Sequence, residues 1–406
     1  MIKKELSDKI KYLIMLAFVT LLPFSKKAIP VIIGLWVIVW LIEARFATKL
    51  KQLFKSPQLL LLILFYLLHI VGLLYTKNMK SGLFDIEVKM SLFIIPIIIL
   101  DNKLLSNKKY FNNLLRIFIL STFISVIVCF SQALYHYIIN DDWRLLYYYN
   151  FSIFHHTSYF SLYLMLSISM IFYLFIKKEI KGTILSFVYS IFLIFFLMGI
   201  YYASSRSAII TLIFLLIFIS IYIAIKSKRK WISLVLFILL GSSIITTINV
   251  NNRFAFYFQN SGKLISDLYN NDLTKSNDER FQIWGSAIEV VKENIIFGVG
   301  TGDVKDNLFE KYKKNNLNKL VESSFNVHNQ ILENFVILGL IGGILFLIIL
   351  FYPLVVKPEL LYSMFFIIIL SNFIFESMLN TQAGVTFFAF FFSLFVLYKK
   401  REKTYN

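Results

Sequence analysis

Long apolar runs recur from one end of this 406-residue chain to the other, and they constrain its fold more than any other feature. A helix needs about 20 mostly apolar residues to cross a bilayer core that is roughly 30 Å thick. The runs therefore predict membrane-spanning helices, whereas a membrane β-barrel would show alternating segments of about 10 residues. Twelve spans are expected, at residues 10–24, 28–44, 58–76, 82–100, 112–137, 158–176, 183–202, 207–225, 231–249, 328–352, 359–379 and 381–398.

The composition agrees with a protein that lies in the lipid bilayer. Hydrophobic residues make up 58% of the chain and charged residues 16%, whereas soluble proteins carry about 25% charged residues. The net charge of +18 comes from basic residues in short loops between apolar runs. This pattern is typical of loops that face anionic lipid, and we do not expect nucleic acid as a partner. The single cysteine, Cys129, lies in an apolar run, so no disulfide framework is expected.

The distribution of lysine and arginine predicts the orientation of the chain. If the N-terminus lies in the cytoplasm, the inner segments hold 23 basic residues and the short outer loops hold six. Cytoplasmic loops carry such an excess, so we expect both termini in the cytoplasm. An even number of spans follows from that placement.

A long polar stretch divides the chain into three parts. Residues 1–249 hold the first nine predicted spans, residues 250–327 form a large outer loop, and residues 328–406 hold three spans and a short cytoplasmic tail. Apolar residues at helical spacing predict a helix over 279–296, which ends in the glycine-rich sequence "GVGTG". We therefore expect a folded outer cap, in which Asp303 is a solvated loop residue.

Two arginines at the outer side of the predicted bundle are candidates for binding an anion. Arg206 lies in a turn between two spans, where a guanidinium either snorkels to the interface or faces a polar cavity. Arg280 opens the predicted loop helix, and a surface ion pair with Asp278 or Glu279 is the alternative to a functional role. Trp284, four residues further on, is expected to pack beside the Arg280 guanidinium.

A histidine at the start of the tenth predicted span is the candidate general base. His328 is followed by Asn329, and imidazole is the side chain best suited to accept a proton near neutral pH. A polar helix cap and a residue at the membrane interface are the alternative roles for this histidine. Gly339 and Gly342–Gly343 are expected to let the helix approach neighbouring helices closely.

Metal and nucleotide sites are not expected. No cluster of His, Cys and carboxylates has the spacing of metal ligands, and the adjacent His155 and His156 would point in different directions on a helix. The sequence "GVGTGD" follows a predicted helix and not a strand, so it lacks the context of a dinucleotide-binding loop. Asp85 and Lys89 are expected to form an ion pair along one helix.

These features together resemble the O-antigen ligase family, which forms a superfamily with its polymerase relatives. The ligase motif is His, then Asn, Ser or Gln, nine residues, Gly, two residues, and Gly, Thr or Tyr. The turn "SSRSA", the "R…W…GVG" segment and the long loop between the ninth and tenth spans also resemble this family. The resemblance covers roughly residues 150–400 well and the first 100 residues only by topology. The motif positions are filled by His328, Asn329, Gly339 and Gly342.

The resemblance implies an all-α, GT-C-like membrane glycosyltransferase that needs neither a metal nor another cofactor. Such an enzyme would move a glycan from undecaprenyl pyrophosphate to a hydroxyl of a lipid A–core sugar, at the periplasmic face of the bacterial inner membrane, with inversion. A polymerase of the same superfamily and a protein O-oligosaccharyltransferase remain as alternatives with the same donor. A flippase or transporter is less favoured, because the polar residues lie at the outer rim and no repeat is evident.

The resemblance also implies roles for individual residues. Arg206 and Arg280 match the arginines of the family and would stabilise the pyrophosphate leaving group. His328 would accept the proton of the acceptor hydroxyl. Further contacts with substrate or with these groups are expected from Asn329, Glu376, His156, Tyr159 and Trp284.

Overall fold

Helices and loops build the part of the chain that the computed structural model describes, which is residues 4–100, 102–226, 273–276, 278–323, 325–356 and 359–402. There is no β-strand within these residues, so the predicted all-α class is confirmed. The predicted ninth span, 231–249, lies outside them. The α-helices are α1 (Lys4–Leu21), α2 (Ala28–Glu43), α3 (Phe46–Phe54), α4 (Pro57–Gly72), α5 (Met79–Lys89), α6 (Ser91–Ile99), α7 (Lys108–Asn140), α8 (Thr157–Ile176), α9 (Thr183–Ala203), α10 (Arg206–Lys226), α14 (Glu279–Glu293), α15 (Val304–Lys314), α16 (Asn318–Ser323), α17 (Gln330–Val355), α18 (Leu360–Phe375) and α19 (Gln382–Glu402). Short 3-10 helices lie at Leu73–Tyr75 (η1), Lys103–Ser106 (η2), Trp143–Leu146 (η3), Leu273–Lys275 (η4) and Met378–Asn380 (η5).

Six of the described helices are long and apolar enough to cross a membrane. They are α4 extended by η1, α7, α8, α9, the Ser207–Lys226 part of α10, and α17. The bent pair α2 and α3, which meet at an angle of 114°, would be a seventh span. A helix lies at each predicted span within the described residues, but the number of twelve spans stays a prediction.

The predicted spans 10–24 and 82–100 each contain a buried lysine that shortens their apolar length. Lys11 of α1 is wholly buried, and its ammonium lies 2.8 Å from a carboxylate oxygen of Glu43 in α2. The predicted span 82–100 is divided into α5 and α6, and the predicted ion pair of Asp85 with Lys89 is confirmed at the end of α5. Burying such charges is costly unless they are paired, which explains why each has a partner of opposite sign.

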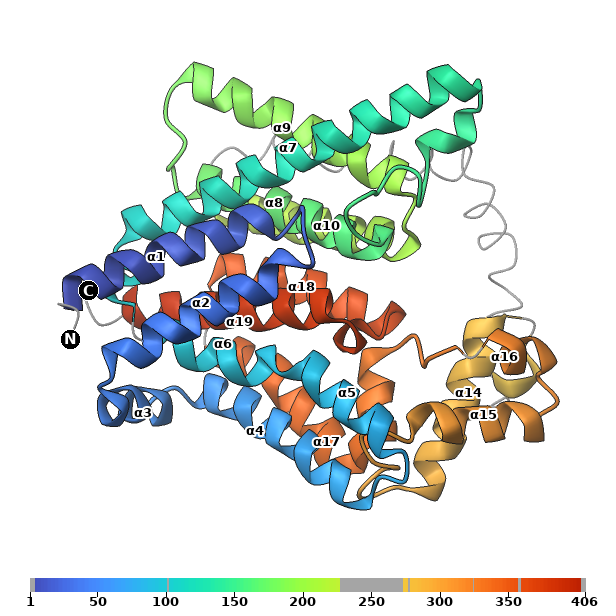
Figure 1. Cartoon of the computed structure of the whole chain (residues 1–406). Helices are drawn as coiled ribbons and strands as arrows, with labels where there is room; N and C mark the ends of the chain where they lie inside the picture. The colour runs from blue at the N-terminus through green and yellow to red at the C-terminus, as the bar shows by residue number, and fades with distance from the viewer. Residues whose placement is uncertain are drawn as a thin grey trace.

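Helix α19 forms the centre of the bundle (Figure 1). Its side chains from Val385 to Tyr398 are buried on every face of the helix. A helix that is apolar all round belongs in the interior, and six phenylalanines fill this position. It packs against α6 and α18, which lie on opposite sides of it in Figure 1.

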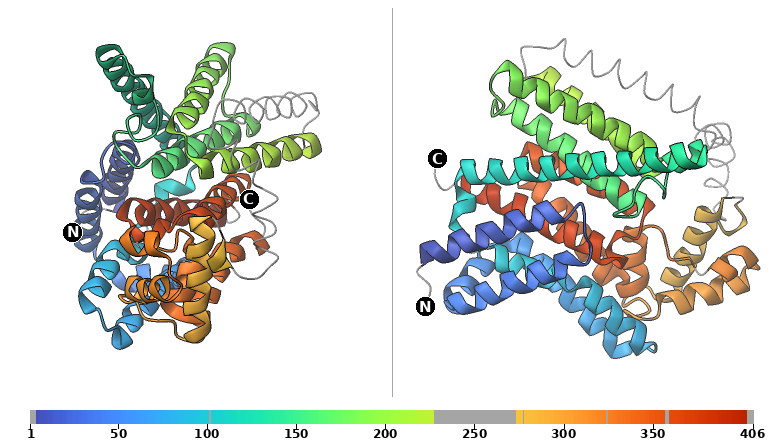
Figure 2. Two further views of the ribbon diagram at one scale, coloured as in Figure 1. Left: turned by 90° about the vertical axis from the view of Figure 1, so that its right-hand side faces the viewer. Right: turned by 45° about the horizontal axis from the view of Figure 1, so that its top comes forward.

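Helices α14, α15 and α16 lie at one end of the molecule, and both chain termini lie at the other (Figures 1 and 2). We call the end with these three helices the distal end. A separation of this kind is what the predicted orientation requires, because it puts the termini on one side and the large loop on the other. The assignment of the two ends to cytoplasm and periplasm stays a prediction.

The segment after α14 is hydrogen bonded into a break in α17. The N–H of Val299 donates to the carbonyl of Val336 (2.9 Å), and the N–H of Leu340 donates to the carbonyl of Ile295 (2.8 Å). The glycine-rich sequence at the end of the predicted loop helix therefore pairs with the backbone of the helix that follows His328. These bonds fix the distal helices to the bundle.

Gly339 makes this break, and its role differs from the predicted one. Its φ is +61°, in the region that side chains other than glycine rarely adopt, and α17 is kinked there. A Cβ on Gly339 would lie 2.3 Å from the carbonyl oxygen of Ile296. The close neighbour of this glycine is thus the loop that carries Ile296. The prediction from the sequence was a neighbouring helix.

Asp303 attaches the segment that follows α14, which we call the distal segment, to a second part of the bundle. Its carboxylate accepts hydrogen bonds from the backbone N–H groups of Lys77 and Asn78, each at 2.7 Å. The side chain is 4% exposed, so the prediction of a solvated loop residue was wrong. Thr301 adds a bond from its hydroxyl to the carbonyl of His69 in α4 (2.6 Å). The distal segment is therefore held to α4 as well as to α17.

Candidate functional site

Glu376 is the point at which side chains from three parts of the chain meet. One carboxylate oxygen accepts a hydrogen bond from the Ser158 hydroxyl (3.2 Å) and lies 3.9 Å from the Arg280 guanidinium. The other lies 3.6 Å from Nδ1 of His328. Three of the predicted site residues, Arg280, His328 and Glu376, are therefore close together at the distal end. We call Ser158, Arg280, His328 and Glu376 the Glu376 cluster.

Arg280 reaches the cluster from the first turn of α14. Asp278 caps this helix by accepting a hydrogen bond from the N–H of Arg280 (2.8 Å), as an N-terminal aspartate commonly does. The guanidinium lies over the ring of Phe375, with 6.0 Å between the guanidinium carbon and the ring centroid. Trp284 packs edge-on against Phe281, and its predicted contact with the guanidinium stays a prediction.

His328 occupies an unusual backbone conformation just before α17. Its φ is +50°, and positive values are uncommon for residues other than glycine and mark strained positions. The side chain of Asn326 accepts a hydrogen bond from its N–H (3.2 Å), and the ring packs near Phe325. The helix cap is Asn329, whose side chain accepts a bond from the N–H of Leu332 (2.9 Å). His328 is therefore not the cap, which was one of the two alternative roles for it.

The start of α17 is tied to the segment that carries Glu376. The Gln330 side chain accepts a hydrogen bond from the N–H of Leu379 (2.6 Å). The Asn380 amide donates to the carboxylate of Glu333 (2.5 Å). The first bond is buried and the second is part-buried, and they set the spacing between His328 and Glu376, which flank the two bonded segments.

His156 joins the cluster through Ser158. It precedes α8, and its Nδ1 accepts a hydrogen bond from the N–H of Ser158 (3.3 Å). The Tyr159 ring lies 6.2 Å from the His156 ring, centroid to centroid. Burial lowers the pKa of His156; the charge of Glu376 opposes this shift, whereas the charges of Lys26 and His328 add to it. The net result is a pKa below the usual value, which favours the neutral imidazole.

The cluster holds Glu376 in its ionised form. Burial acts to raise the pKa of this carboxyl group. Its interactions with His328, followed by the charge of Arg280, outweigh burial and leave the pKa below the usual value. A carboxylate with this pKa is charged at neutral pH and stabilises a positive charge on the adjacent imidazole.

Arg206 begins α10, and its side chain is outside the described part of the chain. The turn before it lies beside the loop that leads to His156, because the N–H of Tyr148 donates to the carbonyl of Tyr202 (2.9 Å). Helix α10 also packs against α8 and α18, the helices next to Ser158 and Glu376. The backbone therefore places Arg206 at the same end as the cluster.

Sequence reasoning did not find Ser158 or Phe375. From the sequence, a serine near the start of a predicted span is expected to be an ordinary cap residue, and a phenylalanine inside an apolar run is expected to be a core residue. Their contacts with Glu376 and Arg280 depend on which helices pack together, and spacing along one helix carries no such information. The pair His155–His156 was the available signal for this segment. Among the described residues, no group of three or more His, Cys, Asp or Glu side chains is placed to hold a metal ion.

The fold and the cluster define a class: an all-α, multi-pass membrane protein whose polar residues converge at one end of an apolar bundle. A family model described as O-antigen ligase matches residues 191–347, which include the C-terminal part of α9, Arg206, Arg280, His328 and Gly339. The resemblance to the O-antigen ligase family is thereby confirmed over this segment. A membrane enzyme of the ligase and polymerase type, in a bacterial membrane, is what this family match supports.

One curated relative was also found. An uncharacterized protein of Haemophilus influenzae is 27% identical over 192 residues, which is 46% of this chain and 47% of that protein. The alignment thus spans about half the length of the relative. The name of that protein states no activity.

Proposed function

We propose that the chain is an O-antigen ligase-like glycosyltransferase that moves a glycan from undecaprenyl pyrophosphate to a hydroxyl of an acceptor sugar. The reaction takes place at the periplasmic face of the bacterial inner membrane. Both chain termini lie on the opposite, cytoplasmic side. The acceptor is a lipid A–core sugar. The observation that carries the proposal is the convergence of Arg280 and His328 on Glu376. A cation for a leaving phosphate and a base for an attacking hydroxyl lie side by side there.

His328 is the proposed general base. The acceptor oxygen forms a bond to the anomeric carbon while the bond from that carbon to the pyrophosphate oxygen breaks, and the hydroxyl proton passes to the imidazole. Nδ1 faces Glu376 at 3.6 Å, so Nε2 is the nitrogen that takes the proton. Glu376 orients the ring and stabilises the imidazolium that forms. A single displacement of this kind inverts the anomeric configuration.

Arg280 is proposed to bind the leaving pyrophosphate. Its guanidinium is 3.9 Å from Glu376, which is beyond hydrogen-bond distance, and its side chain is 32% exposed. Its N–H groups are therefore available to phosphate oxygens, for which the planar guanidinium is well suited. Arg206, at the same end of the bundle, would supply a second positive charge. With two such cations, the proposed reaction needs no metal or other cofactor.

The remaining parts of the chain have supporting roles in this proposal. The bundle formed by residues 1–249 and 328–406 accepts the polyprenyl tail, and the loop 250–327 covers the sugars. Tyr159 follows Ser158 of the cluster in the chain, and Trp284 lies in α14 together with Arg280. Both side chains would contact glycan. Asn329 would contact substrate only if its amide nitrogen is used, because its oxygen caps α17.

The acceptor is tested by replacing His328 with alanine in cells and analysing their glycolipids. If the chain is a ligase, the glycan stays on the lipid carrier and the lipid A–core is uncapped. A polymerase would give caps of a single unit, and a protein O-oligosaccharyltransferase would leave the glycolipids intact and remove glycan from protein. A flippase would retain glycan on the cytoplasmic side. Normal surface glycan with normal protein glycosylation would contradict the proposal.

A further inference from the structure

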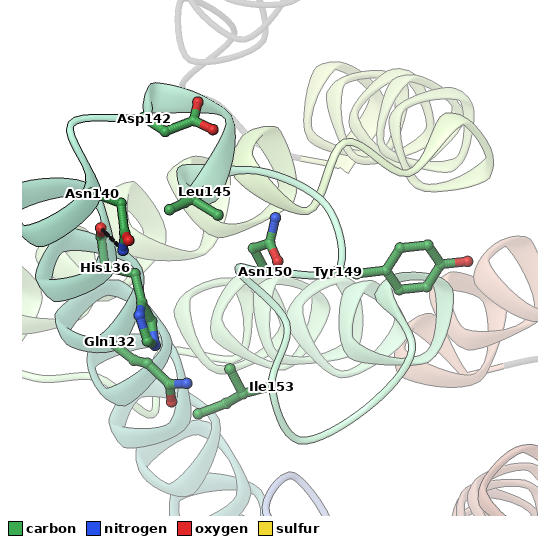
Figure 3. Close-up of a pocket in the computed structure, with 8 residues that line it drawn as sticks. All are labelled: Gln132, His136, Asn140, Asp142, Leu145, Tyr149, Asn150 and Ile153. Carbon is green, nitrogen blue, oxygen red and sulfur yellow. Dashed lines mark hydrogen bonds between the residues drawn. The ribbon is translucent and has the colours of Figure 1, made fainter.

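A pocket of about 530 Å³ lies at the C-terminal end of α7, next to the loop that leads to α8 (Figure 3). This volume falls within the range of small-molecule sites, which is about 300–1,000 Å³. Part of its wall comes from the last two turns of α7 and part from η3 and the loop. The residues that line it are Gln132, His136, Asn140, Asp142, Leu145, Tyr149, Asn150 and Ile153.

The lining suits the hydroxyl groups of an uncharged sugar. The amides of Gln132, Asn140 and Asn150 each offer donors and an acceptor, and two aliphatic residues provide apolar surface. Among the described residues of the lining, Asp142 is the one carboxylate, and the Arg144 guanidinium lies 2.9 Å from it. None of these described lining residues is a lysine or an arginine, so they do not suit a pyrophosphate, and their polar groups do not suit a prenyl tail.

Tyr149 connects this pocket with the Glu376 cluster. Its ring points away from the other side chains drawn in Figure 3. The Tyr149 hydroxyl lies 3.1 Å from Nε2 of His156, and the two rings are 5.2 Å apart, centroid to centroid. His156 is bonded to the N–H of Ser158, and the Ser158 hydroxyl donates to Glu376. The pocket is therefore linked to Glu376 through Tyr149, His156 and Ser158.

We propose that this pocket is a saccharide subsite that holds an uncharged sugar unit one or more residues away from the reacting carbon. The inference rests on the proposed glycosyl transfer, because a transferase must hold its glycan beyond the bond that it makes. Gln132 and Asn150 would hydrogen bond the sugar hydroxyls, and Tyr149 would separate the held unit from the reacting one.

The held sugar belongs either to the donor glycan or to the acceptor, and kinetics distinguish these sources. The double variant Gln132→Ala with Asn150→Ala removes two amides from the pocket. If the donor occupies it, this variant raises the KM for the lipid-linked donor about tenfold and leaves the KM for the acceptor unchanged. The reverse pattern identifies the acceptor. A variant with both constants unchanged would contradict the inference.

Direct binding separates this inference from the proposed reaction. The probe is the set of short neutral oligosaccharides released by mild acid from the surface polysaccharide of the producing cell, and the readout is saturation-transfer NMR on the purified full chain. We expect binding by the wild type and by His328→Ala, and about tenfold weaker binding by the double variant. Gln58→Ala, a half-buried glutamine in α4 outside the pocket, is the matched control and should bind like the wild type.

Each failure has its own signature. Absence of saccharide binding by the wild type, or equal binding by the double variant, overturns the subsite even if His328→Ala abolishes transfer. Saccharide binding that depends on the two amides, in a protein whose glycolipids are unaffected by His328→Ala, supports the subsite and overturns the proposed reaction.

Discussion

At the scale of single residues, the proposed transfer site depends on the carboxylate of Glu376. It accepts a hydrogen bond from Ser158 and faces His328 and Arg280 at 3.6 and 3.9 Å. Its lowered pKa means that the folded state favours the ionised form. Its contribution to stability is therefore present at neutral pH and is lost as the pH falls through that lowered pKa.

Replacing Glu376 with glutamine tests its role as the partner of the base. The substitution keeps the shape and removes the charge, so an imidazolium on His328 loses its stabilisation. We expect kcat for glycan transfer to fall by about 10- to 100-fold, with little change in the KM of the donor. Glu359→Gln at the start of α18 is a control outside the cluster. Equal kcat values for Glu376→Gln and the wild type would show that the carboxylate does not assist the base.

Asn329 has two assigned roles that a single variant separates. As the N-cap of α17 it should contribute about 1 kcal/mol to stability, so Asn329→Ala lowers the melting temperature. Asn329→Asp retains the capping oxygen and loses the amide nitrogen. If the amide binds substrate, Asn329→Asp raises KM while the melting temperature stays near that of the wild type. Unchanged kinetics in Asn329→Asp would leave the cap as the role of this residue.

At the scale of elements, the motif glycines acquire a physical meaning that spacing did not reveal. The sequence predicted that Gly339 lets helices approach, but it breaks α17 so that the segment 295–300 pairs with the exposed backbone. The pattern of His, Asn and glycines located the helix and its start. It could not show that the "GVG" segment and the helix around Gly339 are partners, because 36 residues lie between Gly300 and Ile337, whose backbones are hydrogen bonded.

Gly339→Ala should therefore disturb the distal segment. The added Cβ would meet the Ile296 carbonyl oxygen at 2.3 Å, at a φ of +61° that alanine disfavours. We expect a melting temperature several degrees lower and a loss of transfer, measured on purified protein. Gly34→Ala in α2 is the control, since nothing lies within 4 Å of the Cβ it would add. Similar stability of the two variants would contradict the assigned role of Gly339.

Asp303 tests the second attachment of the distal segment. Asp303→Asn weakens two bonds from backbone N–H groups by removing the negative charge of the acceptor. We expect faster proteolysis between α14 and α17, and a reduced transfer rate, because Arg280 is no longer held opposite Glu376. Glu310→Gln, an exposed carboxylate in α15, should behave like the wild type. If Asp303→Asn resists proteolysis as well as Glu310→Gln does, the proposed role of Asp303 in attaching the distal segment is contradicted.

At the scale of the whole molecule, the apolar runs were sufficient to predict an all-α membrane protein. Helix ends followed the predicted spans within a few residues in α2, α8, α9 and α10, because long apolar runs leave little choice of secondary structure. The central position of α19 could not be predicted. Its sequence differs little from those of its neighbours, and the choice of the innermost helix depends on packing among all of them.

The predicted orientation of the molecule rests on the distribution of charge and is open to a direct test. In a Cys129→Ser background, single cysteines at exposed lysines of the two ends, Lys51→Cys in α3 and Lys319→Cys in α16, are treated with a membrane-impermeant maleimide on spheroplasts. We expect labelling at position 319 and protection at position 51 until the membrane is opened. The opposite pattern would reverse the predicted orientation and place the cluster in the cytoplasm.

The central claim, that the Glu376 cluster is the site of glycan transfer, is tested most directly by single-turnover transfer with purified protein. Labelled undecaprenyl pyrophosphate glycan and a lipid A–core acceptor are mixed with the wild type, His328→Ala, Arg280→Lys or the control Arg45→Lys. The account predicts a loss of at least about 100-fold for His328→Ala and a loss of similar order for Arg280→Lys, because an ammonium cannot replace a bidentate guanidinium. Transfer by both cluster variants at the rate of the control would contradict it.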